Sequence, residues 1–328
     1  MMDTRRPVLV PWSDAPRVER MCCRLLVAIG VLLASHSVAA PPLQPTLRER
    51  LAGLRVVAHR GGWGHHDPNT IARFEKTREA GVDAIETDLR VSADGVPFLF
   101  HDRTLGHTTD CQGPIDALPA AAIERCHLKG LDQPPDTFEA ALRWSAGRMV
   151  LNAEFKTPAS IAPAIELVRR YDAYEWVIFQ VANAPLYYRI ARSLDPRVAL
   201  CAAPRGPDAD AQITALLALH DERLVVIELH PELLTRENLE RIQSAGKLTS
   251  INAWYLGRER TFALGIWPFE RIAACTQVFA SGVTIAVTKV PDDCLRQRDR
   301  FADGAAGSSV AGSSAVRGGT ATNAGEPR

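Results

Sequence analysis

The sequence predicts an α/β protein, a TIM-like (β/α)8 barrel with a β-hairpin extension after the second strand. Eight short apolar runs rich in β-branched residues alternate with longer segments in which apolar residues recur every three to four positions. This alternation is typical of βα units in a parallel sheet, and eight such units can close into a barrel. A barrel of this kind takes about 250 residues as one domain, and the chain has 328.

The composition is ordinary for a globular protein, with 46% hydrophobic and 23% charged residues. These proportions argue against a fibre, a coiled coil or a wholly disordered chain. The 38 Lys and Arg residues balance 38 Asp and Glu residues, so the chain lacks the basic character of a nucleic-acid-binding protein.

Residues 1–40 have the layout of a signal peptide. An apolar run at 25–34 follows basic residues and precedes small residues up to Ala40. The run is shorter than the roughly 20 residues that span a bilayer. We expect cleavage near Ala40 and a periplasmic or secreted product without stable membrane insertion; a membrane anchor or a buried helix is the alternative. The true start is either Met1 or Met21.

The remaining chain divides by composition into a linker at 41–50, a barrel domain at 51–301 and a disordered tail at 302–328. The tail is rich in Gly, Ser and Ala and has no apolar periodicity. The expected strands of the barrel are 55–59, 84–89, 150–155, 177–181, 198–202, 224–229, 248–253 and 283–288. Helical patterns between them include 70–80, 160–171, 185–194, 210–220 and 236–245.

One further apolar run, 96–100, follows the second strand after a short turn that contains Asp94 and Gly95. A parallel crossover needs a dozen or more residues, whereas Asp-Gly is a hairpin signal. The run should therefore return antiparallel and bring His101 back to the level of Glu86 and Asp88.

The next segment, 102–136, is longer than an ordinary βα connection, and we expect it to contact substrate or to form a lid. Five cysteines follow residue 40, so at least one is unpaired within the chain. In an oxidising compartment the expected pairs are Cys111 with Cys126 and Cys275 with Cys294. Buried free thiols are the alternative.

Chemically reactive side chains gather at the ends of the first three expected strands and at the end of the hairpin. They are His59, Arg60, Glu86, Asp88, His101, Glu154 and Lys156. Three carboxylates at one barrel mouth repel each other unless a cation lies among them, and oxygen ligands suit Ca²⁺ or Mg²⁺. Surface ion pairs with Arg60, Arg90 or Lys156 are the alternative reading.

These residues also provide the groups that phosphoryl transfer needs. The metal and Arg60 can neutralise phosphate oxygens, Lys156 adds a point charge, and the imidazoles of His59 and His101 can exchange protons with attacking and leaving oxygens. Trp254, at the end of the seventh expected strand, can line a pocket for the substrate or pack in the core.

The strings His59-Arg60-Gly61, Asn69-Thr70, Glu86-Thr87-Asp88, His101-Asp102 and Glu154-Phe155-Lys156 resemble the glycerophosphodiester phosphodiesterase family. The resemblance implies a TIM-like barrel that uses a divalent cation to hydrolyse glycerophosphodiesters to glycerol 3-phosphate and an alcohol. It implies metal binding by Glu86, Asp88 and Glu154, acid and base roles for His59 and His101, and phosphate contacts from Arg60 and Lys156.

Two positions depart from the family's pattern. Asp67-Pro68 stands where the family usually has Pro-Glu, and Lys289 stands where it usually has Asp. These departures concern the choice of alcohol more than the phosphoryl chemistry. Two other functions stay open: a phospholipase D-like enzyme for lysophospholipid or sphingomyelin, and a barrel that binds phosphodiesters without turnover.

Overall fold

The computed structural model describes residues 46–62, 69–182, 184–256 and 273–314. The predicted signal peptide, most of the predicted linker, the end of the predicted tail and Pro68 lie outside these ranges. None of the described helices combines the length and apolar character that a membrane span requires.

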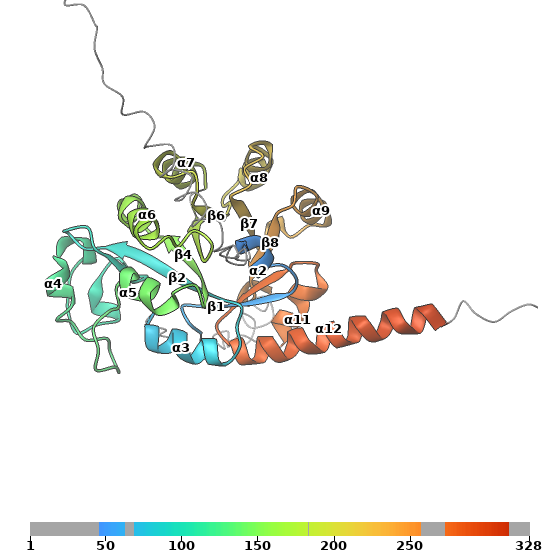
Figure 1. The fold of residues 1–328 in the computed structure, drawn as a ribbon, viewed down its shortest axis with the longest axis horizontal. Helices are drawn as coiled ribbons and strands as arrows, with labels where there is room; N and C mark the ends of the chain where they lie inside the picture. Colours follow the sequence, from blue (N-terminus) through green and yellow to red (C-terminus); the bar gives the residue numbers. More distant parts are fainter. Residues whose placement is uncertain (1–45, 63–68, 183, 257–272, 315–328) are drawn as a thin grey trace, which may run out of the picture. The chain divides into compact units, whose positions relative to one another are not determined.

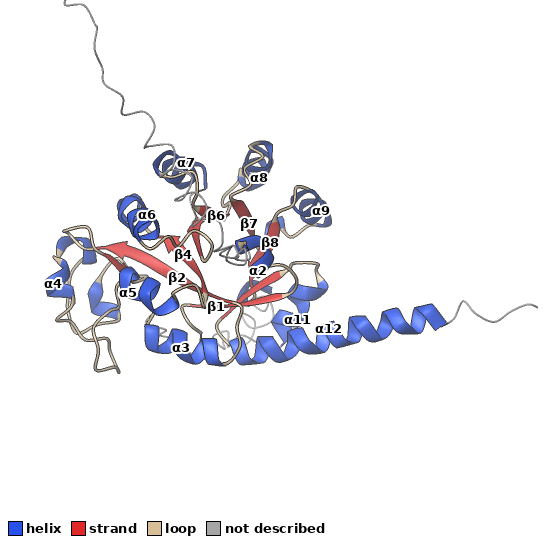
Figure 2. Ribbon diagram, viewed as in Figure 1, coloured by secondary structure: helices blue, strands red, loops and turns tan. Residues whose placement is uncertain are grey.

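Eight parallel strands form a closed barrel in the order β1-β9-β8-β7-β6-β5-β4-β2, and β2 pairs back with β1 (Figures 1 and 2). The predicted fold class is confirmed. The strands are β1 (Arg55–His59), β2 (Ala84–Val91), β4 (Val150–Phe155), β5 (Val177–Val181), β6 (Ala199–Ala202), β7 (Leu224–Leu229), β8 (Leu248–Asn252) and β9 (Ile285–Thr288).

Helices surround these strands (Figure 2). They are α3 (Ile71–Glu79), α5 (Phe138–Ser145), α6 (Ile161–Arg170), α7 (Ala184–Leu194), α8 (Ala209–Ala218), α9 (Arg236–Ser244), α11 (Ala273–Ala280) and α12 (Pro291–Ser314). The main core lies between strands and helices and includes the stacked rings of Phe155 and Phe179. Thr70 caps α3 by accepting a hydrogen bond from the Arg73 amide, so the predicted helix start is confirmed.

The predicted hairpin is present. Strand β3 (Pro97–Leu99) runs antiparallel to β2, with Leu89 opposite Leu99. Gly95 closes the turn at a φ of 84°, a conformation that favours glycine. As a result the Phe100 amide donates to the Asp88 carbonyl (2.9 Å), and the next residue, His101, lies close to the carboxyl half of β2.

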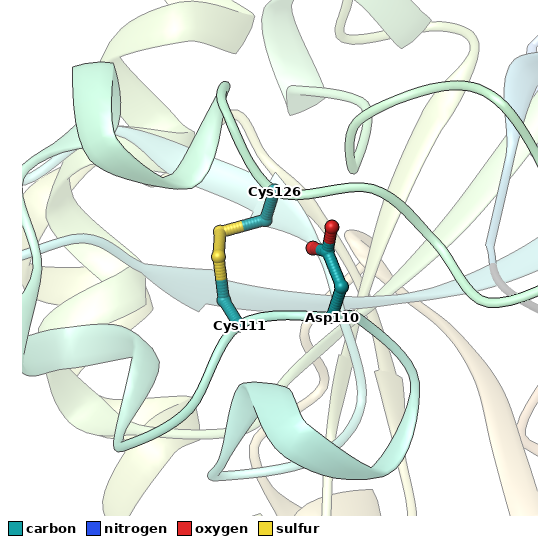
Figure 3. Close-up of side chains that lie close together, drawn as sticks. All are labelled: Asp110, Cys111 and Cys126. Carbon is teal, nitrogen blue, oxygen red and sulfur yellow. A yellow bond between two sulfur atoms is a disulfide. The ribbon is translucent and has the colours of Figure 1, made fainter.

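Residues 102–136 form a packed segment with α4 (Ala120–Ile123) and two short 3₁₀ turns, η1 (Leu105–His107) and η2 (Ile115–Ala117). Leu105, Ile115 and Ile123 form part of its small apolar core. Two disulfides occur at the predicted pairs, Cys111–Cys126 in this segment (Figure 3) and Cys275–Cys294 between α11 and α12. Cys201 is a buried free thiol.

Two helices differ from the boundaries expected from composition. Helix α2 (Leu47–Arg50) lies in the expected linker, because Thr46 and Glu49 form a capping box and Leu47 packs into the barrel interior. Helix α12 continues to Ser314, past the expected start of the tail at residue 302.

Candidate active site

The register of three neighbouring strands brings the predicted site residues together. His59 on β1 is paired with Glu86 on β2, and Asp88 on β2 is paired with Glu154 on β4. Residues two apart on a strand point to the same face, so Glu86 and Asp88 project together. All four residues lie at the carboxyl ends of parallel strands, where barrels of this class have their active sites.

The three carboxylates form one cluster. Glu86, Asp88 and Glu154 each offer an oxygen, and these oxygens lie within 4.8 Å of one another. The Lys156 Nζ lies 2.8 Å from an oxygen of Asp88 and 2.8 Å from an oxygen of Glu154. The Arg60 Nε lies 2.9 Å from Asp88. The predicted phosphate-binding cations therefore lie next to the acids.

Burial and charge act differently on the three acids. Burial, with the charges of Asp88 and Glu154, raises the pKa of Glu86 well above its usual range. Burial raises the pKa of Glu154 as well. Burial also opposes ionisation of Asp88, but Lys156 and Arg60 outweigh it and hold the pKa of Asp88 below its usual range. The acids in turn outweigh burial at Lys156 and raise its pKa.

This cluster fits a divalent cation. Its donors are all carboxylate oxygens, the ligands that Ca²⁺ and Mg²⁺ prefer. Among the described residues no Lys or Arg side chain lies within ion-pair distance of Glu86, whose carboxylate instead accepts a hydrogen bond from the Arg60 amide (3.1 Å). A buried carboxylate without a countercharge is costly, and a metal ion would supply that charge.

A second group of potential ligands does not fit a metal. Asp110 lies beside Cys111 and Cys126 (Figure 3), but these sulfur atoms form a disulfide and so cannot bind metal as thiolates.

His59 is almost completely enclosed. Its Nε2 lies 3.7 Å from the Glu86 carboxylate, and its ring meets the indole of Trp254 edge-on at 4.7 Å. Its Nδ1 has no hydrogen-bond partner among the described residues. Burial and the charge of Arg60 hold the pKa of His59 well below its usual range. The ring is therefore neutral near pH 7 and can accept a proton.

His101 is more open, with 41% of its side chain exposed. Its Nδ1 lies 2.7 Å from one oxygen of Asp102. Burial lowers the pKa of His101, and the charge of Asp88 partly offsets this effect. The hydrogen bond from the Phe100 amide to the Asp88 carbonyl (2.9 Å) places the backbone next to His101 beside β2.

Trp254 lies at the site as well as against the core. The Lys289 Nζ lies 5.1 Å from the centre of its ring, a cation–π distance. The indole thus contacts His59 and lies within cation–π distance of Lys289.

Sequence reasoning assigned Asn69 only to a helix start, but its side chain also supports the site. The Asn69 amide donates to Asp88 (2.9 Å), and its oxygen accepts from the Thr87 hydroxyl (3.1 Å). Its φ of 52° is one that asparagine tolerates. The available signal was an Asn immediately before the helix cap.

A buried polar network around Glu228 on β7 was missed entirely. Its carboxylate accepts hydrogen bonds from Arg205 (2.6 Å) and Gln180 (3.3 Å). Asn152 in turn donates to Gln180 (2.8 Å). The signal was a single acid in an otherwise apolar strand run, since a buried acid requires partners.

The comparisons with known proteins agree with this arrangement. Residues 59–189 match the model of the Glycerophosphoryl diester phosphodiesterase family. This match covers less than half of the chain. The matched stretch includes the metal, histidine and phosphate positions predicted from the sequence.

Curated proteins match the chain over part of their length. The chain is 30% identical over 151 residues to a probable glycerophosphodiester phosphodiesterase 2 of Mycobacterium tuberculosis, covering 46% of this chain and 56% of that protein. It is 47% identical over 95 residues to a human glycerophosphoinositol inositolphosphodiesterase, covering 29% and 17%. The chain thus spans little more than half of the first of these relatives.

Solved structures of phosphodiesterases share the fold. The glycerophosphodiester phosphodiesterase of Agrobacterium tumefaciens matches with a TM-score of 0.61 and 22% identity, over 75% of this chain and 99% of that one. A phosphodiesterase from Oleispira antarctica, solved in complex with the product sn-glycerol-3-phosphate, matches with a TM-score of 0.61 and 20% identity over 75% and 97%.

Proposed function

We propose that this protein is a metal-dependent phosphodiesterase that hydrolyses glycerophosphodiesters to glycerol 3-phosphate and an alcohol. One observation supports this function above all: the carboxyl ends of neighbouring strands bring three acids, two permanent cations and a neutral histidine into one cluster. Each group matches a requirement of phosphoryl transfer.

The roles of the metal ligands follow from the donor set. Glu86, Asp88 and Glu154 would hold Ca²⁺ or Mg²⁺, which when bound supplies Lewis-acid stabilisation of a phosphoryl oxygen. The raised pKa of Glu86 favours a proton on its carboxyl group. Binding of the ion would release that proton.

Arg60 and Lys156 would bind the non-bridging oxygens of the phosphate. Each lies within 3 Å of Asp88, and the charges of Asp88 and Glu154 raise the pKa of Lys156. A phosphate that enters the cluster would meet two positively charged side chains.

His59 and His101 would move the protons. Attack forms one P–O bond and breaks the P–O bond to the alcohol, so one proton leaves the attacking oxygen and one reaches the leaving oxygen. One imidazole would accept the first proton and the other would supply the second. The Asp102 contact to the Nδ1 of His101 leaves its Nε2 for this exchange.

Trp254 and Lys289 would contact the organic part of the substrate. An indole with a cation beside it offers an apolar face and a positive charge together. We therefore propose that this pair influences which alcohol the enzyme accepts.

We also propose that the protein acts after export, in the periplasm or outside the cell. The apolar run at 25–34 and two disulfides support this proposal, since disulfides persist in oxidising compartments. Fractionation of cells that express the full chain tests it: the proposal requires a processed protein in the exported fraction, and an unprocessed cytosolic protein would contradict it.

The activity is tested with a coupled assay for glycerol 3-phosphate. Glycerophosphocholine, glycerophosphoethanolamine and glycerophosphoglycerol are offered with and without a chelator, beside lysophosphatidylcholine and sphingomyelin. The proposal expects product from the water-soluble diesters and its loss with chelator. Turnover of the lipids alone would favour the phospholipase D-like alternative. Thermal stabilisation by a diester without product would favour a binding barrel.

A further inference from the structure

His101, Asp102 and a third residue, His107, form a continuous chain of contacts. One oxygen of Asp102 lies 2.7 Å from the Nδ1 of His101, and its other oxygen lies 2.7 Å from the Nδ1 of His107. Asp102 is half-buried, whereas 64% of the His107 side chain is exposed. The carboxylate is thus bound at both of its oxygens by imidazoles.

The backbone around His107 is held by the packed segment. His107 ends the 3₁₀ turn η1, whose first residue, Leu105, is completely buried. The Leu105 amide donates to the Gly113 carbonyl (2.9 Å), and the Lys129 Nζ donates to the Gly106 carbonyl (2.5 Å). The position of His107 relative to Asp102 is therefore built into the fold.

We propose that His107 is a positioning residue for His101. By binding the second oxygen of Asp102, it keeps the carboxylate in the orientation that accepts the Nδ1–H of His101. That orientation fixes the tautomer of His101 and leaves its Nε2 for proton exchange with substrate. The inference rests on the proposed function, in which His101 transfers a proton.

The contact also has an electrostatic consequence. A hydrogen bond from His107 to Asp102 weakens the effect of the carboxylate charge on His101. Loss of that hydrogen bond should therefore raise the pKa of His101. Other charges act on His101 from the neighbouring strands, namely Asp88, Arg60 and Lys156. Arg90 donates to the His101 carbonyl and also interacts with Asp102 and Asp116. Lys129 is the nearby cation on the side of His107.

The same segment provides a matched control. His127 is also exposed and lies near a carboxylate, 3.4 Å from Asp110. Its acidic neighbours among the described residues are Asp110 and Asp132 rather than Asp102, and it belongs to no part of the proposed machinery. Substitution of His127 therefore also removes a surface histidine that is paired with an acid. It leaves the contacts of Asp102 with His101 and His107 unchanged.

The experiment compares His107→Ala, His107→Asn and His127→Ala with wild type. The asparagine amide can place a donor near the position of the histidine Nδ1. We expect His107→Ala to lower kcat on a water-soluble glycerophosphodiester on the order of tenfold with little change in KM. The limb of the pH profile that reports His101 should move to higher pH. His107→Asn should recover most of kcat, and His127→Ala should resemble wild type.

Equal kcat and pH profile in His107→Ala and wild type would overturn the inference, as would equal losses in His107→Ala and His127→Ala. An NMR titration of the His101 ring gives a second reading that needs no turnover. An upward shift of its pKa in His107→Ala supports the contact, and an unchanged value overturns it. If wild type hydrolyses no diester, the proposed function fails, and the NMR result still decides whether His107 acts on His101.

Discussion

His59 and Glu86 are direct neighbours across the β1–β2 pair, and the Nε2 of His59 lies 3.7 Å from the Glu86 carboxylate. This relationship joins one of the two proposed acid–base residues to the proposed metal site. Burial acts on both groups, because it lowers the pKa of His59 and raises the pKa of Glu86.

Removal of the Glu86 charge should abolish most turnover. Glu86→Gln keeps the size of the side chain but removes an anionic ligand, so we expect kcat/KM on glycerophosphocholine to fall on the order of 10²-fold or more. Steady-state kinetics with saturating Ca²⁺ or Mg²⁺ measure this loss. Glu124→Gln, at an exposed position, serves as control, and equal activity in the two variants would contradict the role of Glu86.

Removal of the His59 imidazole should act on the chemical step. His59→Asn leaves a polar side chain beside Trp254 but cannot exchange a proton, so kcat should fall by about 10²- to 10⁴-fold. We expect KM to change much less, because Arg60 and Lys156 still bind the phosphate. A loss of kcat below about threefold, with normal folding by circular dichroism, would exclude His59 as acid or base.

Metal binding should stabilise the folded chain. A ligand at 100 times its dissociation constant contributes about 2.7 kcal/mol, so Ca²⁺ or Mg²⁺ should raise the melting temperature of metal-free protein. Differential scanning fluorimetry of wild type and Glu154→Gln measures the effect, which should be much smaller in the variant. Equal shifts in both proteins would place the ion elsewhere.

Asp195 should make stability depend on pH far from the active site. Its buried carboxylate accepts hydrogen bonds from Arg197 (2.9 Å) and Tyr174 (2.9 Å). The Arg197 hydrogen bond is the main reason that the pKa of Asp195 lies below its usual range in the folded state. The stabilisation is therefore fully present above about pH 4 and declines as pH falls toward the folded-state pKa.

Asp195→Asn should consequently lower the free energy of unfolding by about 1–3 kcal/mol at pH 7. The difference from wild type should shrink as pH falls below about 4. Urea titrations at several pH values measure both quantities, and Asp116→Asn, at an exposed position, is the control. A difference that stays constant with pH would show that the charge of Asp195 does not stabilise the fold.

Much of the barrel could be predicted because its strands are short apolar runs with clear borders. The bounds of β1, β4, β5 and β7 agree with the predicted ranges. The hairpin also followed from local chemistry, since Asp94-Gly95 leaves too few residues for a parallel crossover. Its register then determined where His101 lies.

Other features depend on how side chains meet once the chain has folded, which a sequence pattern does not show. Glu228 is paired with Arg205, 23 positions earlier in the chain, and Asp102 binds two histidines only because the turn η1 folds back. Helix α2 was missed although its capping box is visible in the sequence. In that case the expectation of a linker outweighed a local signal that was correct.

The central claim is that Glu86, Asp88 and Glu154 bind one divalent ion beside two imidazoles. Crystals of the wild-type protein soaked in Mn²⁺, an ion with a strong anomalous signal, test it directly. We predict an anomalous peak within coordination distance of all three carboxylates, on the side that His59 and His101 face. A peak at other residues only, with Asp88 still paired to Arg60 and Lys156 and with Glu154 still paired to Lys156, would contradict the claim.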